Sequence, residues 1–367
     1  MEFLDLKAQY KSLQKEIDGS IKKVIRDGIF IGGPHVEEFE NRMAQLSGVP
    51  YALGLNSGTD ALLLSLRALD IKGGDEVITT PFSFIATAEV ILVLSAKPVF
   101  VDIDPDTFTI DPKQIEQKIT KRTKTIIPVH LFGQMAEMDS IMKLARKYEL
   151  YVIEDAAQAI GATYKEKTAG SIGDAGCFSF FPSKNLGGFG DGGMITTKHK
   201  RLSQAVRLLR NHGSSPKEKY INIALGTNSR LDALQAAILN VKIGHLKEWN
   251  AKRMERAIFY NTLLGKIACI KTPFIPSSST HIFHQYTIRA EKRDNLKEYL
   301  KQKGIPTMIY YPLGLHLQPV FQHLGYKKGD FPEAEKASRE VLSLPIYPEL
   351  AKKDQSIISE HIKRFYS

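Results

Sequence analysis

Residues 51–69 read YALGLNSGTDALLLSLRAL. A short apolar run typical of a buried strand leads into the turn residues Asn56, Ser57 and Gly58, and a run with helical periodicity follows. The same order continues downstream as DEVITT before FIATAEVILVL, KPVFVDI before PKQIEQKI, KTIIPVHL before MDSIMKLARKY, and finally YVIED. This alternation predicts an α/β fold whose central sheet is mostly parallel and covered by helices on both faces.

Two domains are expected from the patterns beyond this repeat. AGCFSFF and GMITT indicate further strands, and helical patterns dominate from Lys198 to about Lys266. The last hundred residues contain the strand-like run HQYTIRA, a helix over 293–303, the run TMIYYP and a helix over 354–365. We therefore predict a large α/β domain over 1–248, which includes an N-terminal helical segment, and a smaller α+β domain over 249–367.

Composition argues against several partners and compartments. The net charge is +10, but the basic residues are scattered through amphipathic segments, so no nucleic-acid partner is expected. No secretory signal opens the chain, and VILVLSA (90–96) is too short to span a membrane. The two cysteines have no neighbours at metal-ligand spacing, and DIDPDTFTIDPK lacks the glycine and final glutamate of a calcium loop. A cytoplasmic protein with no metal site is expected.

The stretch FSFFPSKNLGGFGDGG (178–193) places one lysine, Lys184, between an apolar run and a glycine-rich loop. Its glycines satisfy G-x-G-x-x-G, but the strand-like GMITT follows where a dinucleotide-binding motif requires a helix. A phosphate-binding Walker loop requires glycine before the lysine, whereas Ser183 precedes Lys184. The remaining interpretation is an amine positioned to react with a ligand, in a segment whose glycines let it turn between two strands.

An aldehyde cofactor such as pyridoxal phosphate requires a reactive lysine, an acid for its ring nitrogen and donors for its phosphate. Asp155 ends the strand YVIED, where it could meet a ring nitrogen or simply cap a helix. The turn containing Gly58 and Thr59 precedes a helix whose N-terminus could bind phosphate, and Ser179 could add a donor. Phe84 could stack on the ring, although an aromatic residue at that place is more often a core residue.

Taken in order, NSGTDALLLSL, PFSFIATA, VIEDAAQAIGA, FSFFPSKNLGGFGDGG and TNSRLDALQAA resemble the DegT-type nucleotide-sugar aminotransferases. The resemblance covers nearly the whole chain and implies the fold type I architecture of pyridoxal-phosphate enzymes. It implies that Lys184 is the Schiff-base lysine and Asp155 the partner of the pyridinium nitrogen. It also implies cofactor contacts for the phenolic oxygen, the ring face and the phosphate, made respectively by Gln158, by Phe84, and by Gly58, Thr59 and Ser179.

The resemblance further implies a homodimer with shared active sites, because Asn228 matches an asparagine that reaches the phosphate in the neighbouring subunit. Ser229 stands where many members have tyrosine, and Lys184 argues against the dehydratases of this family, which carry histidine at its position. HIFHQYTIR (281–289) and YYPLGLHLQPVF (310–321) resemble the branch that acts on 3-keto sugars. Within this resemblance, the residues expected to contact substrate are Arg230, Tyr311 and His316.

The expected reaction moves an amino group from L-glutamate, through pyridoxamine phosphate, to the 3-keto carbon of a dTDP-linked 6-deoxyhexose. A UDP-linked 3-keto-2-acetamido sugar is the near alternative, because nothing in the chain identifies the nucleobase, and a 4-keto sugar ranks third. A non-catalytic cofactor-binding regulator is the alternative from a different class.

Overall fold

A seven-stranded sheet lies at the centre of the computed structural model, which describes residues 1–215, 217–218 and 220–367. Its strand order is β1-β9-β8-β5-β4-β2-β3. β9 runs antiparallel to both of its neighbours, and the other neighbouring strands are parallel, which confirms the mostly parallel sheet expected from the sequence. The strands are β1 (Tyr51–Leu55), β2 (Glu76–Thr79), β3 (Lys97–Phe100), β4 (Thr123–Ile126), β5 (Tyr151–Asp155), β8 (Ala175–Ser179) and β9 (Gly193–Thr197).

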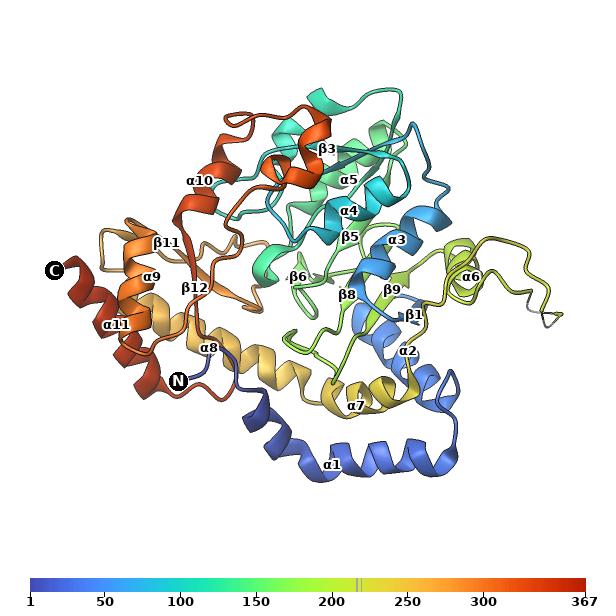
Figure 1. The fold of residues 1–367 in the computed structure, drawn as a ribbon, viewed down its shortest axis with the longest axis horizontal. Coiled ribbons are helices and arrows are strands. Elements are labelled where there is room, and N and C mark those ends of the chain that lie inside the picture. The colour runs from blue at the N-terminus through green and yellow to red at the C-terminus, as the bar shows by residue number, and fades with distance from the viewer. Residues whose placement is uncertain (216, 219) are drawn as a thin grey trace.

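Side chains alternate along the strands and feed two separate hydrophobic layers. Leu53 and Cys177 point into a layer closed by α3 (Gly58–Ala68), α4 (Ala86–Val93) and α6 (Lys200–Leu209). Ala52 and Phe178, one residue along each strand, point into the opposite layer. That layer is closed by α2 (Pro34–Ser47), α5 (Met138–Lys147) and α7 (Ala233–Ile243), and α1 (Leu6–Asp27) packs outside α7 (Figure 1).

The C-terminal part forms a second, smaller sheet in the order β10-β11-β12, built from Ile270–Lys271, Tyr286–Ala290 and Val341–Leu344. Its helices α8 (Leu246–Leu264), α9 (Arg293–Gln302) and α11 (Lys352–Tyr366) share one core with this sheet. The predicted domain boundary falls inside α8, because Trp249 packs with α1 and Tyr260 packs with the small sheet. The division into 1–248 and 249–367 therefore stays a prediction. Among the described residues, no helix has the length and apolar character needed to cross a membrane.

Two expected helical regions are absent. PKQIEQKI folds into two short 3₁₀ turns, Pro112–Gln114 and Glu116–Lys118, because the segment is brief and its β-branched isoleucines disfavour a longer helix. The segment between α6 and α7 is also non-helical over its described residues. There Gly213 has φ +68° and lies against the backbone of Ala224, an approach and a backbone conformation that a helix does not contain.

Asp102 connects the large sheet to α10 (Pro332–Glu340), a helix that the sequence patterns did not reveal. Its carboxylate accepts the backbone N–H groups of Glu333 and Ala334, each at 2.9 Å. These are free donors at the helix N-terminus, and Asp102 is 4% exposed. A side chain 230 residues earlier in the chain thus caps α10.

We predict that Asp102→Ala lowers the free energy of unfolding by about 1–2 kcal/mol, because two N–H donors at a helix N-terminus, one of them buried, lose their acceptor. Urea unfolding followed by circular dichroism measures the change. Asp106→Ala is the matched control, because Asp106 is exposed in the same loop. Equal stability of the two variants would contradict this role for Asp102.

Candidate active site

Lys184 lies in the connection between β8 and β9, two antiparallel strands in which Ser179 pairs with Gly193. The backbone N–H of Lys184 donates to the carbonyl of Phe181 at 2.8 Å, and the chain begins a tight turn there. A Cβ on Gly187 would lie 2.3 Å from the carbonyl oxygen of Pro182, so only glycine allows this return. Burial lowers the pKa of the Lys184 amine to about 8, although the Asp155 carboxylate acts in the opposite direction. Its pKa therefore lies within about one unit of physiological pH, so a minor fraction of the amine is neutral there.

Asp155 lies at the carboxyl end of β5, as the sequence predicts. The hydroxyl of Thr87 donates to one carboxylate oxygen at 2.7 Å, and the N–H of Ala157 donates to the other at 3.3 Å. No helix follows directly, so Asp155 does not act as a helix cap. Burial raises the pKa of Asp155, and these hydrogen bonds together with the Lys184 charge oppose the rise. A carboxylate in this environment gains from meeting a protonated ring nitrogen.

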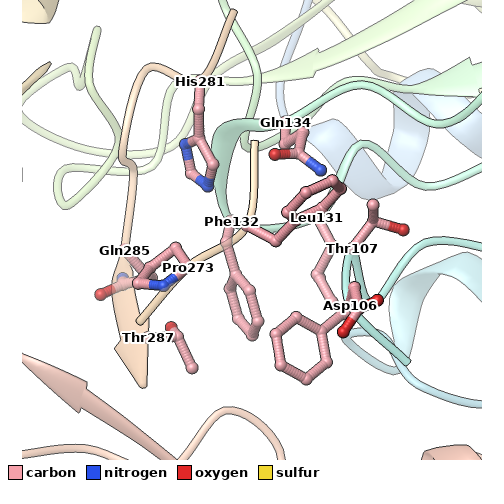
Figure 2. Close-up of a pocket in the computed structure, with 11 residues that line it drawn as sticks. Asp106, Thr107, Leu131, Phe132, Gln134, Pro273, His281, Gln285 and Thr287 are labelled. Atoms are coloured by element: carbon pink, nitrogen blue, oxygen red, sulfur yellow. The ribbon is translucent and has the colours of Figure 1, made fainter. Parts of the chain in front are cut away.

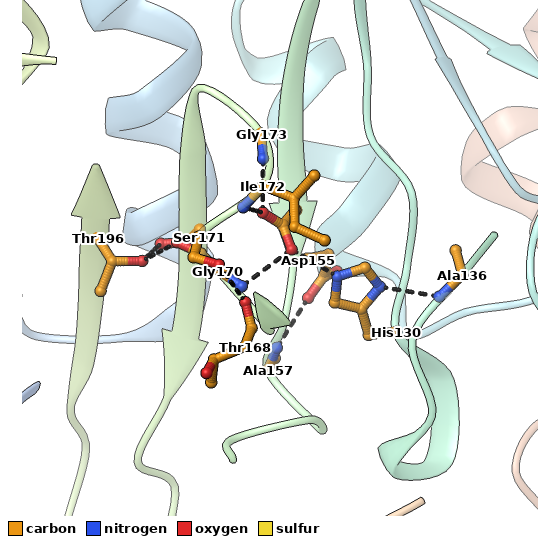
Figure 3. Close-up of polar contacts among 12 residues, drawn as sticks. His130, Ala136, Asp155, Ala157, Thr168, Gly170, Ser171, Ile172, Gly173 and Thr196 are labelled. Atoms are coloured by element: carbon orange, nitrogen blue, oxygen red, sulfur yellow. Dashed lines mark hydrogen bonds and ion pairs between the residues drawn. The ribbon is translucent and has the colours of Figure 1, made fainter. Parts of the chain in front are cut away.

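A second buried carboxylate fixes the end of β5 from the opposite face. Glu154 accepts the N–H groups of Gly170, Ile172 and Gly173 at 2.7–2.9 Å, and its Oε2 lies 2.9 Å from Nε2 of His130 (Figure 3). Burial by itself raises the pKa of Glu154, but the His130 bond and the backbone donors outweigh it and lower that pKa. His130, which the sequence left without a role, supports the strand that carries Asp155.

The predicted phosphate residues come together at the N-terminus of α3. Ser57 caps this helix by accepting the N–H of Asp60 at 3.0 Å, and Gly58 and Thr59 form its first turn. A Cβ on Gly58 would lie 2.8 Å from the Cβ of Ser179, so the end of β8 closely approaches the helix start. Free backbone donors, the positive end of the helix dipole and a serine hydroxyl thus meet at one place, which suits a phosphate.

Gln158 links the sheet edge to the C-terminal part. Its Oε1 accepts the N–H of Phe132 at 2.7 Å, and its Nε2 donates to the hydroxyl of Tyr311 at 3.1 Å. Phe84, predicted to cover the ring face, is 56% exposed, so its ring is available to a ligand. Tyr311, which is predicted to contact substrate, is thus hydrogen-bonded to Gln158, which is predicted to contact the cofactor. Below, the cofactor group means Lys184, Asp155, Gln158, Phe84 and the residues at the start of α3.

The other predicted residues lie apart from this group. Asn228 is exposed, and its neighbour Ser229 donates to the Asn56 side chain at 3.0 Å, beside the start of α3. Arg230 donates to Asn211 at 2.9 Å. His316 is 1% exposed and lies 3.2 Å from Glu335, packed under α10. The structure does not bring His316 to the cofactor group, and its role as a substrate contact stays a prediction without support from these contacts.

A small cavity lies between the loop Leu131–Gln134 and the segment before β11 (Figure 2). His281 and Gln285 line it, and Gln134 Oε1 has no partner among the described residues. Its volume of about 10 Å³ suits one water molecule, so a cofactor or a sugar must bind elsewhere.

The arrangement fits pyridoxal phosphate. A desolvated amine can react with its aldehyde, a buried carboxylate can meet its ring nitrogen, and a helix N-terminus can bind its phosphate. Two residues of this group escaped the sequence patterns. Thr87 holds Asp155 from α4, and its only signal was its place in PFSFIATA. His284 Nδ1 lies 3.3 Å from the side-chain oxygen of Asn185, the residue after Lys184, and no local pattern predicts that contact.

The chain is similar to known proteins over nearly its whole length. A model of the DegT/DnrJ/EryC1/StrS aminotransferase family matches residues 11–363. The chain is 52% identical to a protein named pleiotropic regulatory protein from Geobacillus stearothermophilus, over 99% of this chain and 98% of that protein. It is 46% identical to UDP-N-acetyl-3-dehydro-alpha-D-glucosamine 3-aminotransferase from Acidithiobacillus ferrooxidans, over 98% and 96% of the two chains.

The chain is also 42% identical to dTDP-3-amino-3,4,6-trideoxy-alpha-D-glucose transaminase from Streptomyces venezuelae, over 95% of this chain and 91% of that protein. The solved structure of S. venezuelae DesV with a ketimine intermediate superposes with a TM-score of 0.97 at 40% identity, covering 100% and 98% of the chains. The family resemblance and the cofactor predicted from the sequence are confirmed. The chain belongs to the DegT/DnrJ/EryC1/StrS family and is a pyridoxal-phosphate-dependent aminotransferase.

Proposed function

We propose that the enzyme transfers an amino group from L-glutamate to the 3-keto carbon of a nucleotide-linked sugar, and that this sugar is a dTDP-linked 6-deoxyhexose. The observation that carries the proposal is the desolvated amine of Lys184 in the same site as the buried carboxylate of Asp155. The names of the sugar-transaminating relatives, which act at carbon 3, support the position of the keto group.

In this proposal the chain's own groups divide the work. Lys184 takes a proton from the α-carbon of the amino donor. In the reverse steps with the keto sugar, it gives a proton to the carbon that receives the amino group. An amine with a pKa near the working pH suits both transfers. Asp155 keeps the ring nitrogen protonated, and the start of α3 anchors the phosphate. The cofactor, when bound, supplies the electron sink for the carbanion. Tyr311 and Arg230 are proposed to contact the sugar nucleotide.

A second candidate substrate is a UDP-linked 3-keto-2-acetamido sugar. It is favoured by the 46% identity to the UDP-sugar enzyme, against 42% to the dTDP-sugar enzyme. The name of the Geobacillus relative supports a regulatory role as the alternative, whereas the names of the sugar-transaminating relatives support an enzyme.

We propose a homodimer that shares its active sites. Large apolar side chains around the cofactor group are exposed in the single chain, including Phe84, Phe181 and Phe189 at 56%, 53% and 43%. Leu225, in the segment that leads to Asn228, is 88% exposed. Exposed apolar surface of this extent next to an active site is typical of an interface between subunits.

We predict that Lys184→Ala lowers the rate of amino transfer by at least about 10³-fold, because both the reactive amine and the proton carrier are lost. The variant should also lose the visible absorbance of lysine-bound cofactor while keeping its circular dichroism spectrum. Lys198→Ala is the control, since Lys198 is an exposed lysine that donates to the carbonyl of Ile172. Retained transamination in Lys184→Ala would refute the assignment.

We predict that mixed dimers of two inactive variants regain activity, because each active site is shared between subunits. Asn228→Asp should inactivate by placing a carboxylate against the phosphate of the partner's cofactor. Refolding this variant with an equal amount of Lys184→Ala should restore about one quarter of wild-type activity, because half of the dimers are mixed and each holds one intact site. No gain over the separate variants would contradict a shared site.

We predict which sugar restores the enzyme after its conversion to the pyridoxamine form with L-glutamate. Return of the yellow absorbance is expected with a 3-keto dTDP-sugar and not with its 4-keto isomer. A faster return with the UDP-linked 3-keto-2-acetamido sugar would select the second candidate. Return only with the 4-keto compound would refute the assignment to carbon 3.

A further inference from the structure

Two buried hydroxyls connect the turn after β2 to the carboxylate of Asp155. The hydroxyl of Ser83 lies 2.8 Å from that of Thr87, and Thr87 Oγ1 lies 2.7 Å from Oδ2 of Asp155. Ser83 is 3% exposed and Thr87 is fully buried, so both hydroxyls are shielded from bulk water. Among the described residues, Thr87 is the only hydrogen-bond partner of the Ser83 hydroxyl. Ser83 and Thr87 together are called the hydroxyl relay below.

The charge of Asp155 determines the direction of both hydrogen bonds. An ionised carboxylate can only accept, so Thr87 must donate its single hydroxyl proton to Asp155. Thr87 Oγ1 can then only accept from Ser83, whose hydroxyl therefore donates. The N–H of Ala157 donates to the other carboxylate oxygen at 3.3 Å. Each oxygen of the ionised carboxylate thus has a donor, and one of these donors receives a hydrogen bond from a second hydroxyl.

The turn that contains Ser83 is fixed at both of its ends. Phe84, which is predicted to cover the cofactor ring, follows Ser83 directly, and its carbonyl accepts the N–H of Thr87 at 3.3 Å. Before Ser83, the carbonyl of Pro81 accepts the N–H of Leu315 from the C-terminal part at 2.7 Å. The position of the Ser83 hydroxyl is therefore determined by the same turn that presents the ring-covering residue.

Burial opposes the charge that Asp155 requires. Desolvation raises the pKa of Asp155, whereas the Thr87 hydrogen bond, the Ala157 N–H and the Lys184 charge lower it. A neutral carboxyl would lose its attraction for a protonated ring nitrogen. The Lys184 charge is absent whenever that amine is neutral, so the hydrogen bonds to Asp155 are the stabilisation that remains in every state of the lysine.

We propose that Ser83 is a positioning residue for Asp155, and that its hydroxyl acts through Thr87 to keep the carboxylate ionised and oriented toward a ring nitrogen. The inference rests on the proposed role of Asp155 as the partner of that nitrogen. A hydroxyl that receives a hydrogen bond donates a stronger one, so Ser83 strengthens the bond from Thr87 to Asp155. It also fixes the rotation of the Thr87 hydroxyl, because the lone pair that faces Ser83 cannot be replaced there by the proton.

Carbon NMR of the full-length enzyme without cofactor, labelled with ¹³C at the aspartate carboxyl groups, measures the charge of Asp155 directly. Loss of a resonance in Asp155→Asn identifies the signal. We expect the pKa of Asp155 to be higher in Ser83→Ala than in the wild type, and higher still in Thr87→Val, because each change weakens hydrogen bonding to the ionised form. Thr87→Ser keeps the hydroxyl and should stay close to the wild type.

An unchanged or lower pKa of Asp155 in Ser83→Ala would overturn the proposal. The other titratable groups whose charges interact with that of Asp155 stay in place in the three relay variants: Lys184, His130, Cys177 and Tyr311.

A cofactor analogue without the ring nitrogen separates positioning from packing. The enzyme without cofactor is titrated with pyridoxamine phosphate and with its 1-deaza analogue, in which a CH group replaces the ring nitrogen. We expect Ser83→Ala to weaken binding of pyridoxamine phosphate by about 2–10-fold and not to weaken binding of the analogue. Thr79→Val is the control, because the buried Thr79 hydroxyl donates to the carbonyl of Ile127 at 2.9 Å, outside the relay. Equal weakening for both ligands in Ser83→Ala, or none, would overturn the proposal.

Failure of the proposed function gives a different result. If Asp155 did not meet the ring nitrogen, Asp155→Asn would leave the preference for pyridoxamine phosphate over the analogue unchanged. The carbon NMR titration would still show whether Ser83 acts on Asp155. Neither measurement requires a sugar, an amino donor or turnover.

Discussion

The removal of an amine and a carboxylate from water into one site is the constraint on which the rest of this structure depends. Desolvation disfavours both charges: it lowers the pKa of Lys184 and raises that of Asp155. Among the described residues, no hydrogen bond joins the Lys184 amine to the Asp155 carboxylate, so each gains when a cofactor with an electrophilic carbon and a basic ring nitrogen binds. Hydrogen bonds around the two groups offset part of the free-energy cost of their burial. The chief ones are made by Glu154 and Thr87 at the end of β5.

The glycines after Lys184 allow backbone segments to approach one another closely at this site. Their spacing suggests a different use, the binding of a dinucleotide. The G-x-G-x-x-G pattern of Gly188, Gly190 and Gly193 imitates a dinucleotide motif. In the structure a Cβ on Gly193 would lie 2.1 Å from the carbonyl oxygen of Ser57. β9 can therefore pass this close to the start of α3 only because residue 193 is glycine. Gly188 meets the Gln235 side chain, whose Oε1 accepts the N–H of Phe189 at 2.7 Å. These contacts bring the lysine segment and the phosphate end of the site together.

The sequence was most informative where structure is local. Strand and helix patterns from Tyr51 to Thr197 predicted the sheet, because each strand is a short apolar run next to its own turn signals. The antiparallel orientation of β9 and the existence of α10 and β12 were not predictable in this way. Each depends on a distant partner, as α10 depends on Asp102, and propensity within a window contains no information about such a partner.

The same limit applies to the site. Lys184, Asp155, Gly58 and Ser179 could be identified because each belongs to a recognisable motif, and the fold brings them to one edge of the sheet. His284 could not, because its relation to Lys184 passes through Asn185 and Asn250, three side chains from three separate segments. The segment after Lys184 is thus held by α8 and by the approach to β11, and the C-terminal part also reaches the cofactor group through the bond of Tyr311 to Gln158. The C-terminal part therefore contacts both the residue after the amine and Gln158 at the edge of the sheet, and the packing of the two parts of the chain determines the geometry of the site.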